Sequence, residues 1–300
     1  MTAVVEAHRL QKRYGDFVAV ADVSFSVDEG EIFGILGPNG AGKTTTVECL
    51  QGLRSADGGE LQVLGFDPRR EAQGLRRLIG SQLQESALPD RIKVWEALKL
   101  FSSRHEGGPP WEAVLEEWGL NETRNATFGS LSGGQQQRLF VALAVVNGPK
   151  LVVLEEMTTG LDPMSRRMTW GLIRKIREQG TTVLLVTHFM DEAESLCDRI
   201  AVIDDRRVVA IDTVDGLVRR YGGGSLVHFS TDIVDVGFLR SLPGVESVEH
   251  SARRVAVAGT GALLAHVAGA LADRGEFPLD LEVKRPNLED VFLAITGADT

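Results

Sequence analysis

The first 220 or so residues alternate short apolar runs with longer segments in which apolar residues recur every three or four positions. The apolar runs predict buried strands at residues 32–36, 151–154, 182–186 and 199–203. The amphipathic segments predict helices at residues 44–53, 135–146, 164–179 and 190–196. This alternation is typical of an α/β architecture.

A different pattern occupies residues 85–130, where helical periodicity replaces the alternation. The segment contains Trp111 and Trp118 and a cluster of helix-breaking glycines and prolines at residues 107–110. We predict a helical insert within the α/β unit.

A run of glycines at Gly222–Gly224 predicts the main domain boundary, which gives domains at residues 1–221 and 222–300. The second segment alternates like strands at residues 226–230, 245–250, 254–257 and 279–283. It has helical spacing at residues 263–271 and 288–295. These patterns predict a small C-terminal α+β domain.

Composition restricts the classes of function. The chain of 300 residues has 32 Lys and Arg against 42 Asp and Glu, a net charge of −10, which disfavours a nucleic-acid surface. No apolar run approaches the roughly 18 residues of a membrane-spanning helix, and no export signal is visible, so we expect a cytoplasmic protein. Cys49 and Cys197 lack the spacing of a zinc site, and two distant cysteines are no disulfide framework.

A phosphate-binding motif follows the first predicted strand. It reads Gly37, Pro38, Asn39, Gly40, Ala41, Gly42, Lys43 and Thr44, with Thr45 next, and it fits the P-loop pattern. Its glycines allow successive backbone N–H groups to face phosphate oxygens at a helix N-terminus. We expect Lys43 to reach the β and γ phosphates of ATP and the Thr44 hydroxyl to bind Mg²⁺.

A second glycine motif begins the helix predicted near residue 135. It reads Leu131, Ser132, Gly133, Gly134 and Gln135, and such a Ser-Gly-Gly turn can form another anion site. Together with the P-loop, it resembles the signature of the ATP-binding subunit of an ABC transporter. The resemblance covers about the first 220 residues. It implies the P-loop NTPase fold with a helical insert, ATP as ligand, and a homodimer in which the signature faces the partner's nucleotide.

Further positions match the family pattern, and their roles are implied by the resemblance. Gln84 resembles the glutamine that senses Mg²⁺ and the attacking water, and His188 resembles the switch histidine. Asp162 resembles the aspartate of the loop called the D-loop, and Tyr14 resembles the aromatic residue that stacks on adenine.

The strand predicted at 151–154 ends in Glu155, Glu156 and Met157, where the family has Asp-Glu-Pro. Glu156 then stands at the catalytic glutamate, and Glu155 at the aspartate that holds the Mg²⁺ shell. The extra methylene of Glu155 displaces its carboxylate by roughly 1 Å, an error that can cost about a hundredfold in rate. Two hypotheses follow: either the backbone absorbs the longer side chain, or ATP binds and hydrolysis is slowed.

The segment Pro286–Phe292 resembles the end of ATP-binding subunits from drug exporters of the daunorubicin-resistance class. That resemblance implies a separate ABC-2 type permease, which would hold the subunit on the inner face of the membrane, and efflux of a drug-like or amphipathic compound. The helical insert is the expected surface for transmission to it. A helix cap at Asn287 explains the segment equally well.

Two other functions remain open from the sequence. One is a soluble ABC ATPase that acts on nucleic acid or ribosomes, although no second cassette, long coiled coil or basic surface is visible. The other is a nucleotide-dependent binding module with attenuated hydrolysis, which the sequence around Glu155 permits.

Overall fold

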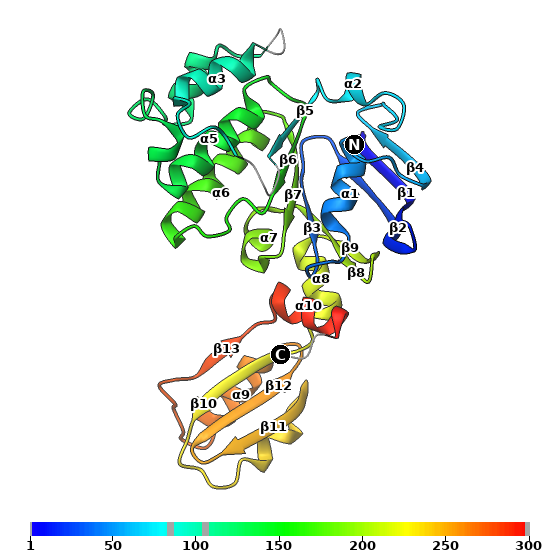
Figure 1. The fold of residues 1–300 in the computed structure, drawn as a ribbon. Helices are drawn as coiled ribbons and strands as arrows, with labels where there is room; N and C mark the ends of the chain where they lie inside the picture. The colour runs from blue at the N-terminus through cyan, green and yellow to red at the C-terminus, as the bar shows by residue number, and fades with distance from the viewer. Residues whose placement is uncertain (1, 83–86, 104–107, 298–300) are drawn as a thin grey trace. The chain divides into compact units, whose positions relative to one another are not determined.

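The computed structural model describes residues 2–82, 87–103 and 108–297. The chain forms two compact units, Met1–Val214 and Asp215–Thr300, and each is described by itself (Figure 1). The division falls after the first residue of helix α8 (Val214–Tyr221), whereas the sequence places it after this helix. Gly222 packs within the second unit, because a Cβ on it would lie 2.9 Å from the Cβ of Pro286, whereas Gly223 is exposed.

A large mixed sheet forms the centre of the first unit. In the described part of the chain it has nine strands in the order β4-β1-β2-β9-β8-β3-β7-β6-β5. Strands β5, β6, β7, β3 and β8 are successive parallel neighbours, while β4, β1 and β2 pair antiparallel. The strand bounds are β1 Ala3–Tyr14, β2 Phe17–Asp28, β3 Ile32–Leu36, β4 Gly58–Val63, β5 Ile79–Gln82, β6 Leu151–Glu155, β7 Thr182–Thr187, β8 Arg199–Asp204 and β9 Arg207–Asp212.

The four strands predicted from apolar runs are confirmed as β3, β6, β7 and β8. The antiparallel strands β1, β2, β4 and β9 are additional to the prediction. They carry mixed sequences, and in β1 only Val5, Ala7 and Leu10 are fully buried. A strand that buries one face alternates apolar with polar residues, and β1 accordingly has no apolar run longer than residues 3–5.

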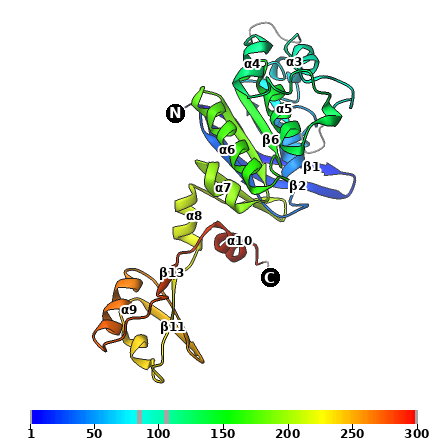
Figure 2. The same ribbon diagram turned by 90° about the vertical axis from the view of Figure 1, so that its left-hand side faces the viewer.

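Helices lie on both sides of the parallel strands. Figure 1 shows α1 between these strands and β1, β2 and β4, with α5, α6 and α7 on the other side. The insert is helical, with α3 against α4 and α5 (Figure 2). The bounds are α1 Lys43–Leu50, α2 Ala72–Leu75, α3 Val94–Ser102, α4 Trp111–Glu117, a 3₁₀ turn at Phe128–Ser130, α5 Gly133–Val145, α6 Pro163–Glu178 and α7 Met190–Leu196.

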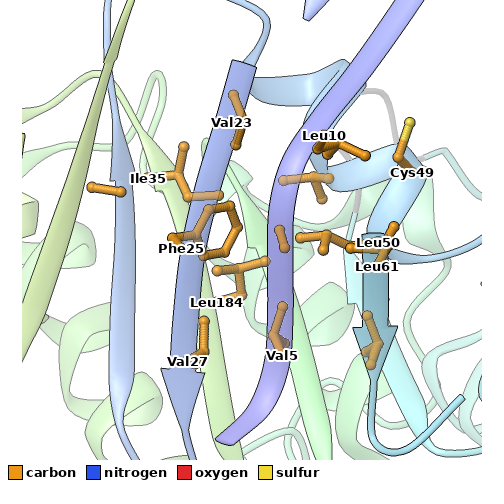
Figure 3. Close-up of a cluster of buried hydrophobic side chains, with 14 of the residues drawn as sticks. Val5, Leu10, Val23, Phe25, Val27, Ile35, Cys49, Leu50, Leu61 and Leu184 are labelled. Carbon is orange, nitrogen blue, oxygen red and sulfur yellow. The ribbon is translucent and has the colours of Figure 1, made fainter. Parts of the chain in front are cut away.

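The core beneath α1 contains side chains from both the parallel and the antiparallel strands of the sheet. Figure 3 shows Leu10 of β1, Phe25 of β2 and Ile35 of β3 packed together with Leu50 of α1 and Leu184 of β7. The side chain of Phe25 is 6% exposed, and the other four are fully buried. Because α1 contributes to this core, the loop that precedes α1 has a rigid support.

The described residues of the second unit contain a four-stranded antiparallel sheet in the order β11-β12-β10-β13. Its core combines the sheet with α9, through Val227, Phe229, Val257 and Val267, all nearly or fully buried. The bounds are β10 Ser225–Ser230, a 3₁₀ turn at Gly237–Ser241, β11 Val245–Ser251, β12 Arg254–Gly259, α9 Leu263–Ala272, β13 Glu282–Lys284 and α10 Leu288–Thr296. This is the split βαβ arrangement, with the 3₁₀ turn in the place of one helix.

The last strand is shorter than expected, because β13 begins at Glu282 and Leu279 lies in an exposed turn before it. The cap at Asn287 is confirmed: its side chain accepts from the N–H of Asp290 at 3.0 Å, and the Asp290 carboxylate accepts from the N–H of Asn287 at 2.9 Å. Among the described residues, no helix has both the length and the apolar character needed to cross a membrane.

Candidate nucleotide-binding and hydrolysis site

The P-loop connects the carboxyl end of β3 to the start of α1, and its glycines are required by close backbone contacts. A Cβ on Gly37 would overlap the carbonyl oxygen of Ile203, and a Cβ on Gly42 would overlap that of Ala19. Gly42 also has a φ of +96°, which side-chain-bearing residues rarely adopt. The curled shape of the loop is therefore set by its packing against the rest of the protein.

A cavity of about 410 Å³ opens over this loop. Strand ends from across the sheet contribute to it, because the carboxyl ends of parallel strands meet at one edge. The lining residues are Phe17, Ala19, Asn39, Gly40, Gly42, Lys43, Thr44, Thr45, Glu155, Glu156, Val186 and His188. The cavity brings together a cation, two carboxylates, hydroxyls and an imidazole at a helix N-terminus.

Lys43 is held inside the loop, with only 6% of its surface exposed. Its Nζ donates to the carbonyl oxygens of Gly37 at 2.8 Å and Pro38 at 3.0 Å. Burial lowers the pKa of the Lys43 ammonium, and the nearby charges of Glu156 and Glu155 oppose that change. The ammonium is therefore desolvated and directed by the backbone, ready to bind an anion.

Glu155 is the last residue of β6 and is 2% exposed. Burial raises the pKa of its carboxyl to about 7, and a hydrogen bond with the Thr44 hydroxyl partly opposes this. Its Oε1 atom has no hydrogen-bond partner among the described residues. An unpartnered buried carboxylate oxygen next to Thr44 suits a hard cation.

Glu156 follows β6 and adopts a left-handed backbone conformation, with a φ of +48°. Its N–H donates to the carbonyl oxygen of Val186 at 2.9 Å, and its Oε1 lies 3.2 Å from Nδ1 of His188. Both contacts come from the neighbouring strand β7 and its end. A strained conformation persists when the surroundings determine it in this way, and such residues concentrate at active sites.

The signature residues begin α5 and form a reciprocal helix cap. The Ser132 hydroxyl accepts from the N–H of Gln135 at 3.4 Å, and Gln135 Oε1 accepts from the N–H of Ser132 at 2.9 Å. A Cβ on Gly134 would lie 2.9 Å from the Ser165 hydroxyl, so this glycine serves packing. A Cβ on Gly133 would meet no described atom within 4 Å. The signature does not line the P-loop cavity of its own chain.

The other residues selected from the sequence are placed as follows. Asp162 is the cap of α6: its Oδ1 accepts from the N–H of Met164 at 2.9 Å, and hydrogen bonds from Ser165 hold the pKa of its carboxyl low. Neither Asp162 nor Tyr14 lines the cavity. Gln84 lies outside the described residues.

Phe17 is an aromatic residue of the cavity that the sequence analysis missed. Its side chain is 55% exposed, and the Arg206 guanidinium lies 4.9 Å from the ring centre. Tyr14 lies across the same hairpin turn, with Lys12 and Arg54 near its ring. Phe17 is marked as a candidate by being a large aromatic residue that is exposed beside the phosphate loop. The sequence alone does not show which aromatic residues are exposed, so it could not indicate Phe17.

A larger cavity, of about 840 Å³, opens at the opposite ends of the same strands, beside Leu78, Lys150 and Thr181. Its walls also include Trp118 and Ile176. Gly40, Gly42, Lys43 and the acidic pair Glu155 and Glu156 all line the smaller cavity. We therefore assign the chemistry to the smaller cavity.

Comparison with known proteins identifies the class to which this site belongs. Residues 20–159 match the family model described as ABC transporter. A solved structure of the ATP-binding subunit of an ABC transporter superposes with a TM-score of 0.63 and 26% identity, over 73% of this chain and 93% of that one.

Whole-chain relatives are similar over the second unit as well. The daunorubicin resistance ATP-binding protein DrrA2 of Streptomyces coeruleorubidus is 36% identical over 99% of this chain and 96% of its own length. The Nod factor export ATP-binding protein I of Cupriavidus pinatubonensis is 37% identical over 100% of this chain and 92% of its own. The chain therefore belongs to the ABC transporter family, as an ATP-binding subunit of the exporter type, and ATP hydrolysis is its activity.

The glycine contacts give a test with a matched control. Gly42→Ala must introduce a Cβ against the Ala19 carbonyl, whereas Gly40, with a φ of +81°, has open space around its position. We expect Gly42→Ala to weaken ATP binding at least about tenfold more than Gly40→Ala, which corresponds to ~1.4 kcal/mol. Titration with a fluorescent ATP analogue measures this, and equal losses would show that space at the loop is not limiting.

Proposed function

We propose that this chain is the ATPase subunit of an exporter, that it forms a homodimer around two ATP molecules, and that it drives a separate ABC-2 type permease. One observation carries the dimer: the cavity holds the P-loop and Glu156, while the signature lies outside it. The open position at Gly133 leaves space for a ligand held by another chain. A second copy would supply that ligand and complete both sites.

Mg²⁺ is the cofactor that we propose for the P-loop cavity. Thr44 and the unpartnered Oε1 of Glu155 are oxygen ligands of the kind that Mg²⁺ prefers. No group of three or more His, Cys, Asp or Glu side chains in the described ranges could hold a metal alone. Most ligands would then be phosphate oxygens and water, and the bound ion would offset charge on the transferred phosphate.

The side chains of the cavity have separate tasks in hydrolysis. Lys43 exchanges its two loop carbonyls for the β and γ phosphates. Glu156 accepts a hydrogen bond from the attacking water and orients it toward the γ phosphate. His188 holds the Glu156 carboxylate through its Nδ1. Gln84 is proposed as a sensor of the water and the ion, and Asp162 as a contact across the dimer.

The exported compound and the cellular location are also proposals. One relative is named for daunorubicin resistance and another for Nod factor export, so similarity does not single out one cargo. A drug-like or amphipathic compound fits the class best. The subunit would lie on the cytoplasmic face of the membrane, held by the permease. The helical insert of residues 85–130 would be the docking surface.

The reading as a nucleic-acid or ribosome ATPase has less support, because the chain carries a net charge of −10 and its relatives are named for resistance and export. The hypothesis of a nucleotide-dependent binding module with attenuated hydrolysis depends on Glu155 alone. It is compatible with an exporter whose hydrolysis is slow.

Removal of the catalytic carboxylate tests the dimer. Glu156→Gln keeps the shape of the side chain but cannot accept the water's proton, so we expect ATP binding to persist and turnover to fall at least about a hundredfold. With ATP and Mg²⁺ this variant should elute as a dimer in size-exclusion chromatography, and the exposed control Glu178→Gln should behave as the parent. A Glu156→Gln protein that binds ATP and stays monomeric would exclude the proposed assembly.

Shortening the neighbouring carboxylate separates the two hypotheses about hydrolysis. Glu155→Asp withdraws the charge by one methylene, to the position that the family uses, and we expect turnover to rise between about threefold and a hundredfold. Phosphate release at saturating ATP and Mg²⁺ measures the rate. An unchanged rate would mean that the backbone absorbs the longer side chain.

Purification from membranes tests the partner. We expect the tagged chain to recover a hydrophobic permease of the ABC-2 type, identified by mass spectrometry and absent from an untagged culture. Recovery of ribosomes or nucleic acid without such a permease would favour the other reading.

A further inference from the structure

Met157 follows the catalytic glutamate, at the position where the family resemblance expects proline. It is the second residue of the catalytic turn, which we define as residues 156–161, and it is 1% exposed. A methionine can pack in any irregular space, so burial alone assigns it no role. Its contacts are more specific.

The amide of Gln137 joins the catalytic turn to two other elements. Its Nε2 donates to Oε1 of Gln82 at 3.0 Å and lies 3.4 Å from Sδ of Met157 in donor geometry. Gln82 is the last residue of β5 and is 6% exposed, and Gln137 is half-buried. The two N–H groups of a glutamine amide are thus matched by two acceptors.

The position of Gln137 on α5 gives this contact a consequence. The helix begins at Gly133 and runs without interruption to Val145, so Gln137 lies on the first turns behind the signature. A helix moves as a rigid element, and a ligand that shifts its N-terminus also shifts Gln137. The thioether of Met157 follows through its contact with the amide, and Glu156 is the adjacent residue.

We propose that Met157 is a positioning residue, which transmits the placement of the signature helix to the Glu156 carboxylate through the amide of Gln137. The inference rests on the proposed dimer, because in it the signature contacts the nucleotide of the partner chain. Each chain would then adjust its own catalytic turn according to the occupancy of the opposite site. A proline here has no side-chain acceptor and could not make this contact.

The strain at Glu156 makes the turn responsive to such a contact. With a φ of +48°, Glu156 keeps its conformation only while its neighbours hold it. Val186 and His188 hold it from β7, and Met157 is the attachment on the side of α5. Loss of that attachment removes a contact that holds the residue next to Glu156.

Substitution of the two partners tests the proposal. Met157→Leu keeps the volume and removes the acceptor, and Gln137→Leu removes the donor. We expect each to lower kcat about three- to tenfold while KM for ATP changes less than about twofold, since misplacement of a positioning group acts on the rate.

The double variant and a neighbouring glutamine supply the controls. Because the two side chains act through one contact, Met157→Leu with Gln137→Leu should be no slower than the slower single variant. Gln136→Ala removes a glutamine of the same helix that donates to the Phe128 carbonyl at 3.3 Å, and its kcat should stay within about twofold of the parent. Melting temperatures confirm that all variants fold.

The outcomes separate this inference from the dimer itself. Met157→Leu combined with Glu156→Gln should still dimerise with ATP, because binding does not need the contact. If this protein dimerises and the Met157→Leu rate equals that of the parent, the positioning role is excluded while the assembly stands. If the kcat of the double variant falls by the product of the two single losses, the two side chains act independently, and the positioning role of Met157 is also overturned. Failure of Glu156→Gln alone to dimerise would remove the assembly on which the inference rests.

Discussion

The site depends on backbone packed against backbone without room for a side chain. At Gly37 and Gly42 the phosphate loop touches the carbonyl groups of Ile203 in β8 and Ala19 in β2. These two strands belong to different parts of the sheet, one parallel and one antiparallel. The loop is therefore clamped between them, and the core under α1 prevents either part from retreating. The backbone N–H groups of the loop are therefore oriented by the packing of the protein itself.

The acidic end of β6 has a different physical character. Glu155 is desolvated enough to raise the pKa of its carboxyl to about 7, and the next residue has a left-handed backbone. Both features cost stability in the resting protein. They are sustained by the hydrogen bond between the Thr44 hydroxyl and Glu155, by the bond that the Glu156 N–H donates to the Val186 carbonyl, and by the contact of Glu156 with His188. The acidic pair is therefore supported by residues that the fold already fixes.

The sequence predicted the parts of this molecule whose signal is local. The P-loop and the strand β3 were evident, because a glycine-rich turn between an apolar run and a helix has few other meanings. Strand β1 was not, since its buried face is visible only with the partner strand in place. Asp162 illustrates another limit: the residue that resembles the D-loop aspartate also caps α6, a structural role that the family pattern does not indicate. Phe17 lines the cavity because of the way the β1–β2 hairpin is placed over the phosphate loop. The spacing of residues along the sequence does not indicate this placement.

Lys43 and the carbonyl oxygens of Gly37 and Pro38 have a thermodynamic consequence for binding. In the proposed binding mode, an arriving phosphate displaces the two hydrogen bonds that the Lys43 ammonium makes to its own loop. The affinity for the nucleotide then depends on the difference between two hydrogen-bonded states of Lys43, one with the loop carbonyls and one with the phosphates. Changes that strengthen or weaken the bonds to the loop carbonyls can therefore alter the affinity without any contact to the nucleotide. A subunit that must release its product in every cycle gains from such a resting partner, because the lysine is never left buried and unpaired.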